Sequence, residues 1–145
     1  MKMSFTYNMV NDVKATKEFY GDILGMKVEQ YAENKYIGFK VSEVNLLFFK
    51  ADRQIPIQTE WAWQPGDATG SEAEIDSFSI EYDETLFREA YKRLKEVPQL
   101  LKKAKPEWRQ KSYWGLTVKD PSGKTIELYT TPNSKPKDTN PVWQD

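Results

Sequence analysis

One carboxylate, Glu127, stands out among the residues that could do chemistry, because its neighbours are typical of a buried β-strand. Ile126 and Leu128 are apolar and alternate with Thr125 and Tyr129, which is the period-two pattern of a half-buried strand. A carboxylate at this position either faces solvent on one side of an antiparallel sheet or points into a cavity. In a cavity it could act as an acid, a base or the partner of a cation. The strand pattern leaves both interpretations open.

Two residue types are missing from the 145 residues, namely cysteine and histidine. Without cysteine there can be no disulfide, no thiolate catalysis and no Cys-ligated metal. Without histidine the chain lacks the usual general base, a Ser-His-Asp arrangement and the commonest transition-metal ligand. Any chemistry must therefore use carboxylates, Tyr, Lys, Arg or a bound cofactor, which disfavours an enzyme.

The composition points to one folded domain. Hydrophobic residues make up 39% of the chain and aromatic residues 14%, which excludes a disordered chain. A net charge of -1 provides no basic surface for a phosphate backbone, so we expect no nucleic-acid partner. No apolar run approaches the ~20 residues of a membrane span, and the first residues lack the apolar region of a signal peptide. We therefore expect a soluble, cytoplasmic protein that does not bind membranes.

A β-hairpin is predicted over residues 114–129 and positions Glu127. Leu116 and Val118 occupy alternate positions of its first strand. The turn between the strands combines Pro121, which presets φ at the first corner, with Gly123, which accepts a positive φ.

The whole chain repeats one order of elements, strand, helix, strand, strand, strand. Asp12 and Asp83 are predicted helix N-caps, and Tyr20 and Tyr91 follow them at the same distance. Gly25 is placed as a helix C-cap. The predicted strands cover residues 4–10, 26–32, 35–41, 45–50, 74–82, 100–108 and the two arms of the hairpin.

The predicted fold class is α+β, with two βαβββ modules over residues 4–50 and 74–131 of a single domain, 1–131. Each module has one helix on the outside of a curved, mixed four-stranded sheet, and the opposite sheet faces enclose a shared cavity.

Two segments lie outside this repeat. Residues 51–73 carry Trp61 and Trp63 and form either a lid or groove wall, or a crossover that caps the core. Residues 132–145 form a polar tail. Its Trp143 could dock on the domain or on a second subunit, but the composition favours a frayed terminus.

Several motifs in this order resemble the vicinal oxygen chelate superfamily, which includes glyoxalase I, bleomycin-binding resistance proteins, fosfomycin-resistance enzymes and extradiol dioxygenases. The resemblance spans residues 5–129 and implies the same paired-module fold. Its motifs are Val10, Asn11 and Asp12 leading into Phe19 and Tyr20; Leu24, Gly25 and Met26; Trp114 and Gly115; Asp120, Pro121, Ser122 and Gly123; and Ile126, Glu127 and Leu128.

Metal-using members of this superfamily place four ligands in the cavity, one on each of four strands. Carried over by position, the resemblance puts these ligands at Phe5, Leu47, Ser77 and Glu127. Only Glu127 is a good ligand, whereas a divalent transition ion needs about three or four N, O or S donors. We therefore expect no metal and no other cofactor, as in the metal-free bleomycin-resistance type.

The remaining expectation is a ligand pocket with one apolar, aromatic wall and one polar, acidic wall. If Phe5 faces the cavity, Tyr7 and Met9 face it too, because alternate residues of a strand lie on the same face. The alternative is that these apolar side chains fill a collapsed core. The expected ligand-binding residues are Phe5, Tyr7, Met9, Leu47, Phe49, Trp61, Trp63, Ser77, Ser79, Glu81, Trp114, Glu127 and Tyr129.

Three functions follow from these observations. The first is a non-catalytic, homodimeric protein that binds or sequesters an aromatic or cationic organic molecule, similar to bleomycin-resistance proteins. The second is a glyoxalase-like or dioxygenase-like metalloenzyme with a non-standard ligand set around Glu127, in which Glu127, Glu81 or Tyr7 acts as acid or base. The third is a dimerising interaction module.

Overall fold

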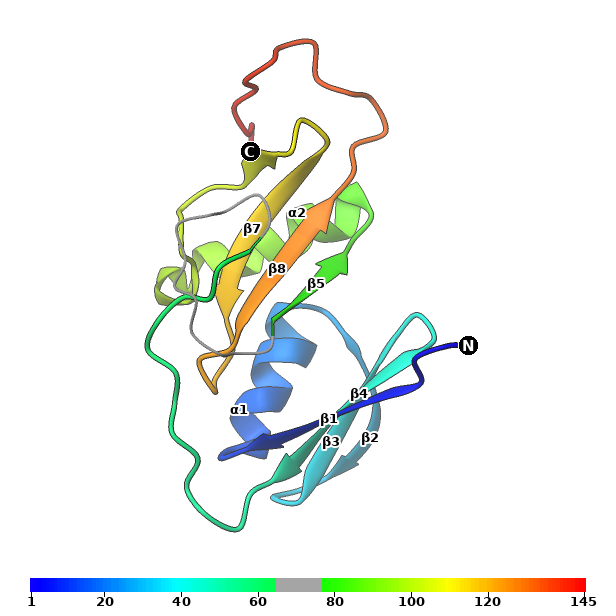
Figure 1. Ribbon diagram of the computed structural model, residues 1–145, viewed down its shortest axis with the longest axis vertical. Helices are drawn as coiled ribbons and strands as arrows, with labels where there is room; N and C mark the ends of the chain where they lie inside the picture. The colour runs from blue at the N-terminus through cyan, green and yellow to red at the C-terminus, as the bar shows by residue number, and fades with distance from the viewer. Residues whose placement is uncertain (65–76) are drawn as a thin grey trace. The chain divides into compact units, whose positions relative to one another are not determined.

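The computed structural model describes residues 1–64 and 77–145 (Figure 1). The chain divides into two compact units, residues 1–57 and residues 58–145, and each unit is described by itself. Each contains one mixed four-stranded sheet and one main helical segment, which confirms the predicted α+β class and the repeated βαβββ order. The prediction of a shared cavity concerns both units together and stays a prediction.

In unit 1 the chain forms a sheet with strand order β1-β4-β3-β2, in which β1 runs parallel to β4. The helical segment begins after Asp12, whose Oδ1 accepts a hydrogen bond of 2.9 Å from the backbone N–H of Ala15. It ends before Gly25, which has a positive φ of 79°. Both predicted caps are thus confirmed. The elements are β1 (Phe5–Val10), α1 (Val13–Lys17), the π-helix η1 (Glu18–Ile23), β2 (Lys27–Ala32), β3 (Tyr36–Val41) and β4 (Val44–Lys50).

The core of unit 1 lies between its helical segment and one face of the sheet. Tyr20 is fully buried there, with its ring centroid 4.7 Å from that of Phe48 and 5.6 Å from that of Phe39. Burial of these large rings contributes to the stability of this unit. The other sheet face is left for the side chains at alternate positions.

Unit 2 repeats the topology, with strand order β5-β8-β7-β6 and β5 parallel to β8. The predicted hairpin is confirmed, since β7 and β8 pair antiparallel. Asp83 caps its helix through a 2.9 Å bond from the backbone N–H of Leu86. The elements are β5 (Phe78–Glu81), α2 (Glu84–Lys95), the 3-10 helix η2 (Pro98–Leu100), β6 (Glu107–Arg109), β7 (Tyr113–Lys119) and β8 (Thr125–Thr130). Residues 74–76 of the predicted strand 74–82 lie outside the described residues.

Two predictions for unit 2 are wrong. The strand expected over residues 100–108 is limited to Glu107–Arg109, with Leu101 forming an isolated bridge to Val118. A proline has no N–H to donate to a sheet, and the strand accordingly starts just after Pro106. The frayed terminus is also wrong at Trp143, which is only 3% exposed. Within the described residues, none of the helices is long and apolar enough to cross a membrane.

Candidate functional site

The sheet of unit 1 presents an aromatic surface on the face opposite its core. Register pairs Phe5, Tyr7 and Met9 of β1 with Asn45, Leu47 and Phe49 of β4, so strand parity places all six side chains on one face. We call Phe5, Tyr7, Met9, Tyr36, Leu47 and Phe49 the aromatic face.

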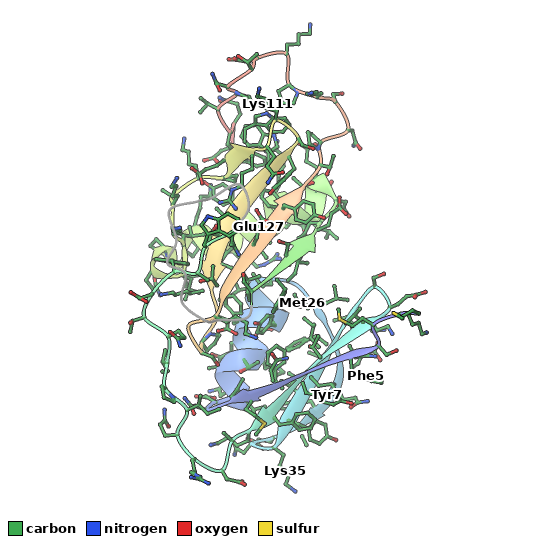
Figure 2. All side chains as sticks on the ribbon, in the orientation of Figure 1. Phe5, Tyr7, Met26, Lys35, Lys111 and Glu127 are labelled. Atoms are coloured by element: carbon green, nitrogen blue, oxygen red, sulfur yellow. The ribbon has the colours of Figure 1, made fainter. Side chains whose placement is uncertain are left out.

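The rings of the aromatic face form a continuous row. Ring centroids lie 6.3 Å apart between Phe5 and Tyr7, 6.2 Å between Tyr7 and Phe49, and 6.2 Å between Phe49 and Tyr36. Met9 extends the face along β1. These separations are within the range of favourable aromatic pairs. The row crosses three strands, with Phe5 and Tyr7 labelled on β1 in Figure 2.

This face stands outside the buried core of unit 1. Phe5 is 48% exposed, Tyr7 73% and Met9 53%, while Leu47 and Phe49 are half-buried. Gly38 makes room for Leu47, because a Cβ on that glycine would lie 2.7 Å from a Leu47 methyl carbon. Contiguous exposed apolar surface is uncommon on a monomeric protein and marks a ligand or protein interface.

Glu127 in unit 2 has a different environment, because its carboxylate is buried and fully paired. The residue is 4% exposed. Its Oε1 accepts hydrogen bonds from Arg109 Nη1 at 2.7 Å and from the Tyr113 hydroxyl at 3.2 Å, and its Oε2 accepts one from Ser79 Oγ at 2.7 Å. A buried carboxylate is tolerated only when paired and hydrogen-bonded in this way. Glu127 thus neither faces solvent nor stands as a lone charge.

Arg109 reaches Glu127 because Gly115 lies between them. Arg109 is on β6, Gly115 on β7 and Glu127 on β8, so the arginine side chain crosses the middle strand. A Cβ on Gly115 would lie 2.5 Å from Arg109 Cδ, so a larger residue at this position would force the arginine side chain to move. Arg109 was not among the predicted site residues. The signal for it in the sequence was Gly115 inside a strand, because a strand glycine marks the close approach of another group.

Further hydrogen bonds tie this pair to neighbouring groups. Arg109 Nη2 donates to Thr117 Oγ1 at 2.9 Å and to Glu107 Oε2 at 3.2 Å. Thr117 Oγ1 in turn donates to Gln64 Oε1 at 3.1 Å. Gln64, which is buried, donates through Nε2 to Ser77 Oγ at 2.9 Å. We call Gln64, Ser77, Ser79, Glu107, Arg109, Tyr113, Thr117 and Glu127 the Glu127 network.

The tyrosines near this network act as neutral donors. Burial and then the nearby Glu127 carboxylate raise the pKa of Tyr113 to about 12, with Arg109 opposing the shift. Burial, followed by Glu81 and Glu127, also raises the pKa of Tyr129. Neither hydroxyl therefore provides a phenolate base at neutral pH. Glu81 is exposed and accepts a 3.3 Å hydrogen bond from Thr131.

The three predicted tryptophans have different surroundings. Trp114 lies on the opposite face of its sheet, because it and Glu127 have opposite parity across the β7–β8 register. Its ring packs against Trp108 at 5.1 Å. Trp61 lies under the Lys119 ammonium at 4.6 Å, and Trp63 is half exposed. The rest of the predicted polar wall, Ser77, Ser79, Glu81 and Tyr129, shares the Glu127 face by strand parity.

The residues at the inferred ligand positions do not fit a divalent metal. Phe5 and Leu47 offer no donor atom, and both Glu127 oxygens already accept hydrogen bonds from protein groups, one of them from a guanidinium. Within residues 1–64 and 77–145, no cluster of three or more acidic, histidine or cysteine side chains could hold a metal. Three or four such donors are the usual requirement.

The chain belongs to the glyoxalase/bleomycin resistance protein/dioxygenase superfamily, whose family model matches residues 8–128. Similar solved structures agree on the fold. A glyoxalase/dioxygenase from Nostoc punctiforme is 21% identical, with 91% of this chain and 92% of that chain covered and a TM-score of 0.69. The oxidase ChaP-H2 is 20% identical, with coverages of 91% and 94% and a TM-score of 0.62.

A lactoylglutathione lyase from Agrobacterium tumefaciens is 20% identical, with coverages of 90% and 92% and a TM-score of 0.57. A search of curated proteins found no match. At these identities the solved structures support the fold alone, so the function must be argued from the residues of this chain.

Proposed function

We propose that this protein is a non-catalytic binder of flat aromatic organic molecules, similar to the bleomycin-resistance members of its superfamily. The observation that carries the proposal is the exposed row of rings on the aromatic face. Tyr7, at its centre, is 73% exposed and neighbours both Phe5 and Phe49. A planar ligand would gain stacking and apolar burial on this face.

The charge distribution supports an aromatic ligand that need not be cationic. The Glu127 carboxylate is opposed by the Arg109 guanidinium at 2.7 Å, so its charge is compensated within unit 2. A cationic ligand would instead be attracted by the faces of the tyrosine and phenylalanine rings, an effect worth about 0.5–1 kcal/mol at an exposed site. Under this proposal, a positive charge on the ligand strengthens binding but is not required for it.

The non-catalytic part of the proposal is supported by the chemistry of the Glu127 network. The chain has no histidine or cysteine, and the pKa of Tyr113 is raised to about 12. The carboxylate of Glu127 accepts three hydrogen bonds from protein groups. A general base needs an accessible lone pair aimed at a substrate proton, which this arrangement does not offer.

We also propose that the protein is a homodimer, because an exposed apolar face of this kind is commonly covered by a second subunit. The same face would then contribute to a groove that takes the ligand, as in the bleomycin-resistance type. The cytoplasmic location stays a prediction of the sequence.

The test is calorimetric titration of the protein with flat aromatic compounds and with their saturated, non-planar analogues. We expect the planar compounds to bind and Tyr7→Ala to weaken binding at least tenfold. Tyr31→Ala is the matched control, since Tyr31 is also an exposed tyrosine of the same sheet, 42% exposed, but its partner Ile37 is buried on the core face.

Equal loss in the two variants would contradict the proposed location. Absence of binding across the panel, together with a monomer–dimer equilibrium that Tyr7→Ala alone shifts towards monomer, would instead identify the aromatic face as an interaction surface.

A further inference from the structure

The C-terminal residues of the chain dock into an aromatic recess of unit 2 that neither the aromatic face nor the Glu127 network involves. Trp143 is 3% exposed. Its ring centroid lies 5.5 Å from that of Phe87, 6.1 Å from that of Tyr91 and 5.2 Å from that of Trp114. We call the surface formed by Phe87, Tyr91 and Trp114, from α2 and β7, the α2 recess.

Two cations of α2 complete this recess and match the chemistry of the tail. The Arg88 guanidinium lies 4.3 Å from the Trp143 ring centroid, and its Nη1 donates to the Gln144 backbone carbonyl at 2.9 Å. Lys95 Nζ lies 3.3 Å from Asp145 Oδ2. The recess therefore recognises an aromatic ring through Arg88 and an acidic group two residues later through Lys95.

The segment that carries Trp143 resembles a bound peptide, because it has no regular secondary structure and contacts unit 2 mainly at its end. Residues 131–145 contain no helix or strand, and most of residues 131–140 are exposed. The docking contacts are concentrated in the last three residues. A non-helical segment held by one large aromatic anchor and flanking charges is one form in which proteins recognise peptides.

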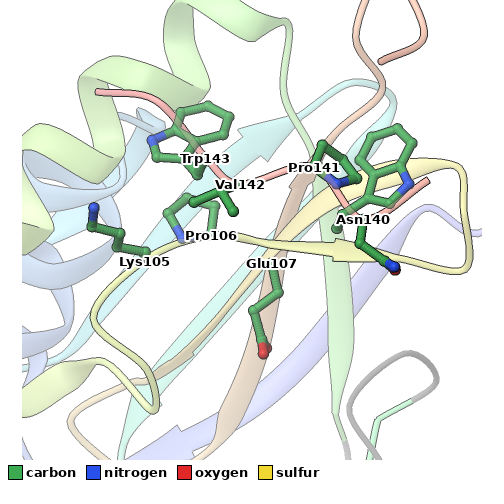
Figure 3. A pocket seen from close by; sticks show the side chains of 8 residues that line it. Lys105, Pro106, Glu107, Asn140, Pro141, Val142 and Trp143 are labelled. Atoms are coloured by element: carbon green, nitrogen blue, oxygen red, sulfur yellow. The ribbon is translucent and has the colours of Figure 1, made fainter. Parts of the chain in front are cut away.

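The fit of the tail in the recess is incomplete. The Trp143 indole N–H is buried, and no hydrogen-bond partner for it exists among the described residues; a buried donor left unpaired weakens a contact. Beside it lies an open pocket of about 320 Å³, lined by Lys105, Pro106, Glu107, Trp108, Pro141 and Trp143 among others (Figure 3). A segment whose aromatic ring carries no unpaired donor, or which has a group filling this pocket, would bind more tightly than the tail does.

We infer that the α2 recess is a peptide-binding surface that the chain's own tail masks, and that its partner is an acidic segment with an aromatic residue two positions before the acid. The tail occupies the recess with the advantage of covalent attachment, equivalent to a local concentration on the order of millimolar. A free partner must therefore bind better than the tail, and the unpaired indole and the open pocket make this possible.

The experiment uses the full chain with Trp143→Ala, which vacates the recess, and a synthetic peptide of residues 138–145, Asp-Thr-Asn-Pro-Val-Trp-Gln-Asp. Binding is measured by fluorescence anisotropy of the labelled peptide. We expect one peptide per Trp143→Ala chain and at least tenfold weaker binding to the wild type, where the tail competes.

Two controls define the contacts. A peptide with alanine in place of its tryptophan should lose binding, and Arg88→Gln added to Trp143→Ala should weaken it. Equal binding to the wild type and Trp143→Ala, or no binding to a folded Trp143→Ala chain at millimolar peptide, would overturn the inference.

A second experiment tests the inference even if Trp143→Ala fails to fold. A specific protease site placed within residues 132–139 allows the tail to be cut after the intact chain has folded. The inference expects the released tail to dissociate on dilution, the remaining chain to stay folded by circular dichroism, and added peptide to restore the contact. Unfolding on loss of the tail would show that Trp143 is a core residue of unit 2, which would overturn the inference.

Discussion

The two sheets of this protein share one topology but distribute their side chains in opposite ways. In unit 1 the strand pair β1–β4 brings Tyr7 next to Leu47, and in unit 2 the equivalent pair β5–β8 brings Ser79 next to Glu127. The apolar pair belongs to an exposed face, whereas the carboxylate is 4% exposed. This is the reverse of the usual expectation that apolar groups are inside and charges outside.

The difference shows that the burial or exposure of each sheet face depends on the groups that cover it or neutralise its charge. Glu127 can be buried because Arg109, Ser79 and Tyr113 supply hydrogen bonds to both of its oxygens. The aromatic face differs, because no described group of unit 1 shields its rings and Tyr7 is 73% exposed. It therefore remains available to an external partner, which we propose to be an aromatic ligand.

The largest effect is expected from removing the cation that compensates Glu127. Arg109→Met leaves the Glu127 carboxylate buried without its ion pair, and we expect a loss of about 3–5 kcal/mol in the free energy of unfolding, measured by urea denaturation. Adding Glu127→Gln should recover part of the loss, because it removes the uncompensated charge. A loss below about 1 kcal/mol, the value of a surface pair, would show that the pair is not buried in solution.

A smaller effect is expected from closing the space through which Arg109 passes. Gly115→Ala puts a Cβ where Arg109 Cδ would be 2.5 Å away, and overpacking of this kind costs about 1–3 kcal/mol. Gly21→Ala is the matched control, since its nearest neighbour would be Phe39 at an ordinary 3.6 Å. Equal unfolding free energies for the two variants would argue against the crossing of Arg109 over β7.

Alkaline pH should weaken unit 2 through Tyr113. Its pKa is raised from 10.0 to about 12 in the folded chain, so between these pH values the unfolded chain loses a proton that the folded chain keeps. The stabilisation of the folded chain that comes from keeping Tyr113 protonated is complete below pH 10 and is lost as the pH rises through about 12. Tyr113→Phe should show a shallower fall in stability over this window, measured by denaturation at stepped pH. An unchanged slope would mean that Tyr113 ionises normally.

The smallest stability effect is expected on the aromatic face itself. Tyr7 is 73% exposed, so Tyr7→Ala should change the unfolding free energy by no more than about 0.5 kcal/mol. Thermal denaturation of the monomeric protein at low concentration measures this. A loss above about 2 kcal/mol would place Tyr7 in a packed core rather than on a binding surface.

The features that the sequence predicted well are those fixed by nearby residues. Asp12 and Asp83 each accept a hydrogen bond from the backbone N–H three residues later. In the turn after β7, Asp120 Oδ1 accepts hydrogen bonds from the nearby N–H groups of Ser122 and Lys124. The order of elements then follows from alternation and helical spacing. These are local properties of the chain, so one sequence is enough to predict them.

The features that could not be predicted from the sequence depend on contacts between residues far apart in the chain. Arg109 is 18 residues from Glu127 and meets it only because β6, β7 and β8 align in one particular way. Trp143 was expected in a frayed terminus because the tail as a whole is polar, but it packs against Arg88 of α2, far earlier in the sequence. Contacts of this kind follow from tertiary structure, which local patterns do not encode.

The proposed binding on the aromatic face is tested by calorimetric titration with two flat aromatic compounds of the same shape, one neutral and one carrying a positive charge. Because the Glu127 charge is compensated by Arg109, we expect affinities within about fivefold of each other, the range of an exposed cation–π contribution, and weaker binding of both compounds to Tyr7→Ala. Binding of the cationic compound alone, unaffected by Tyr7→Ala, would contradict the proposal.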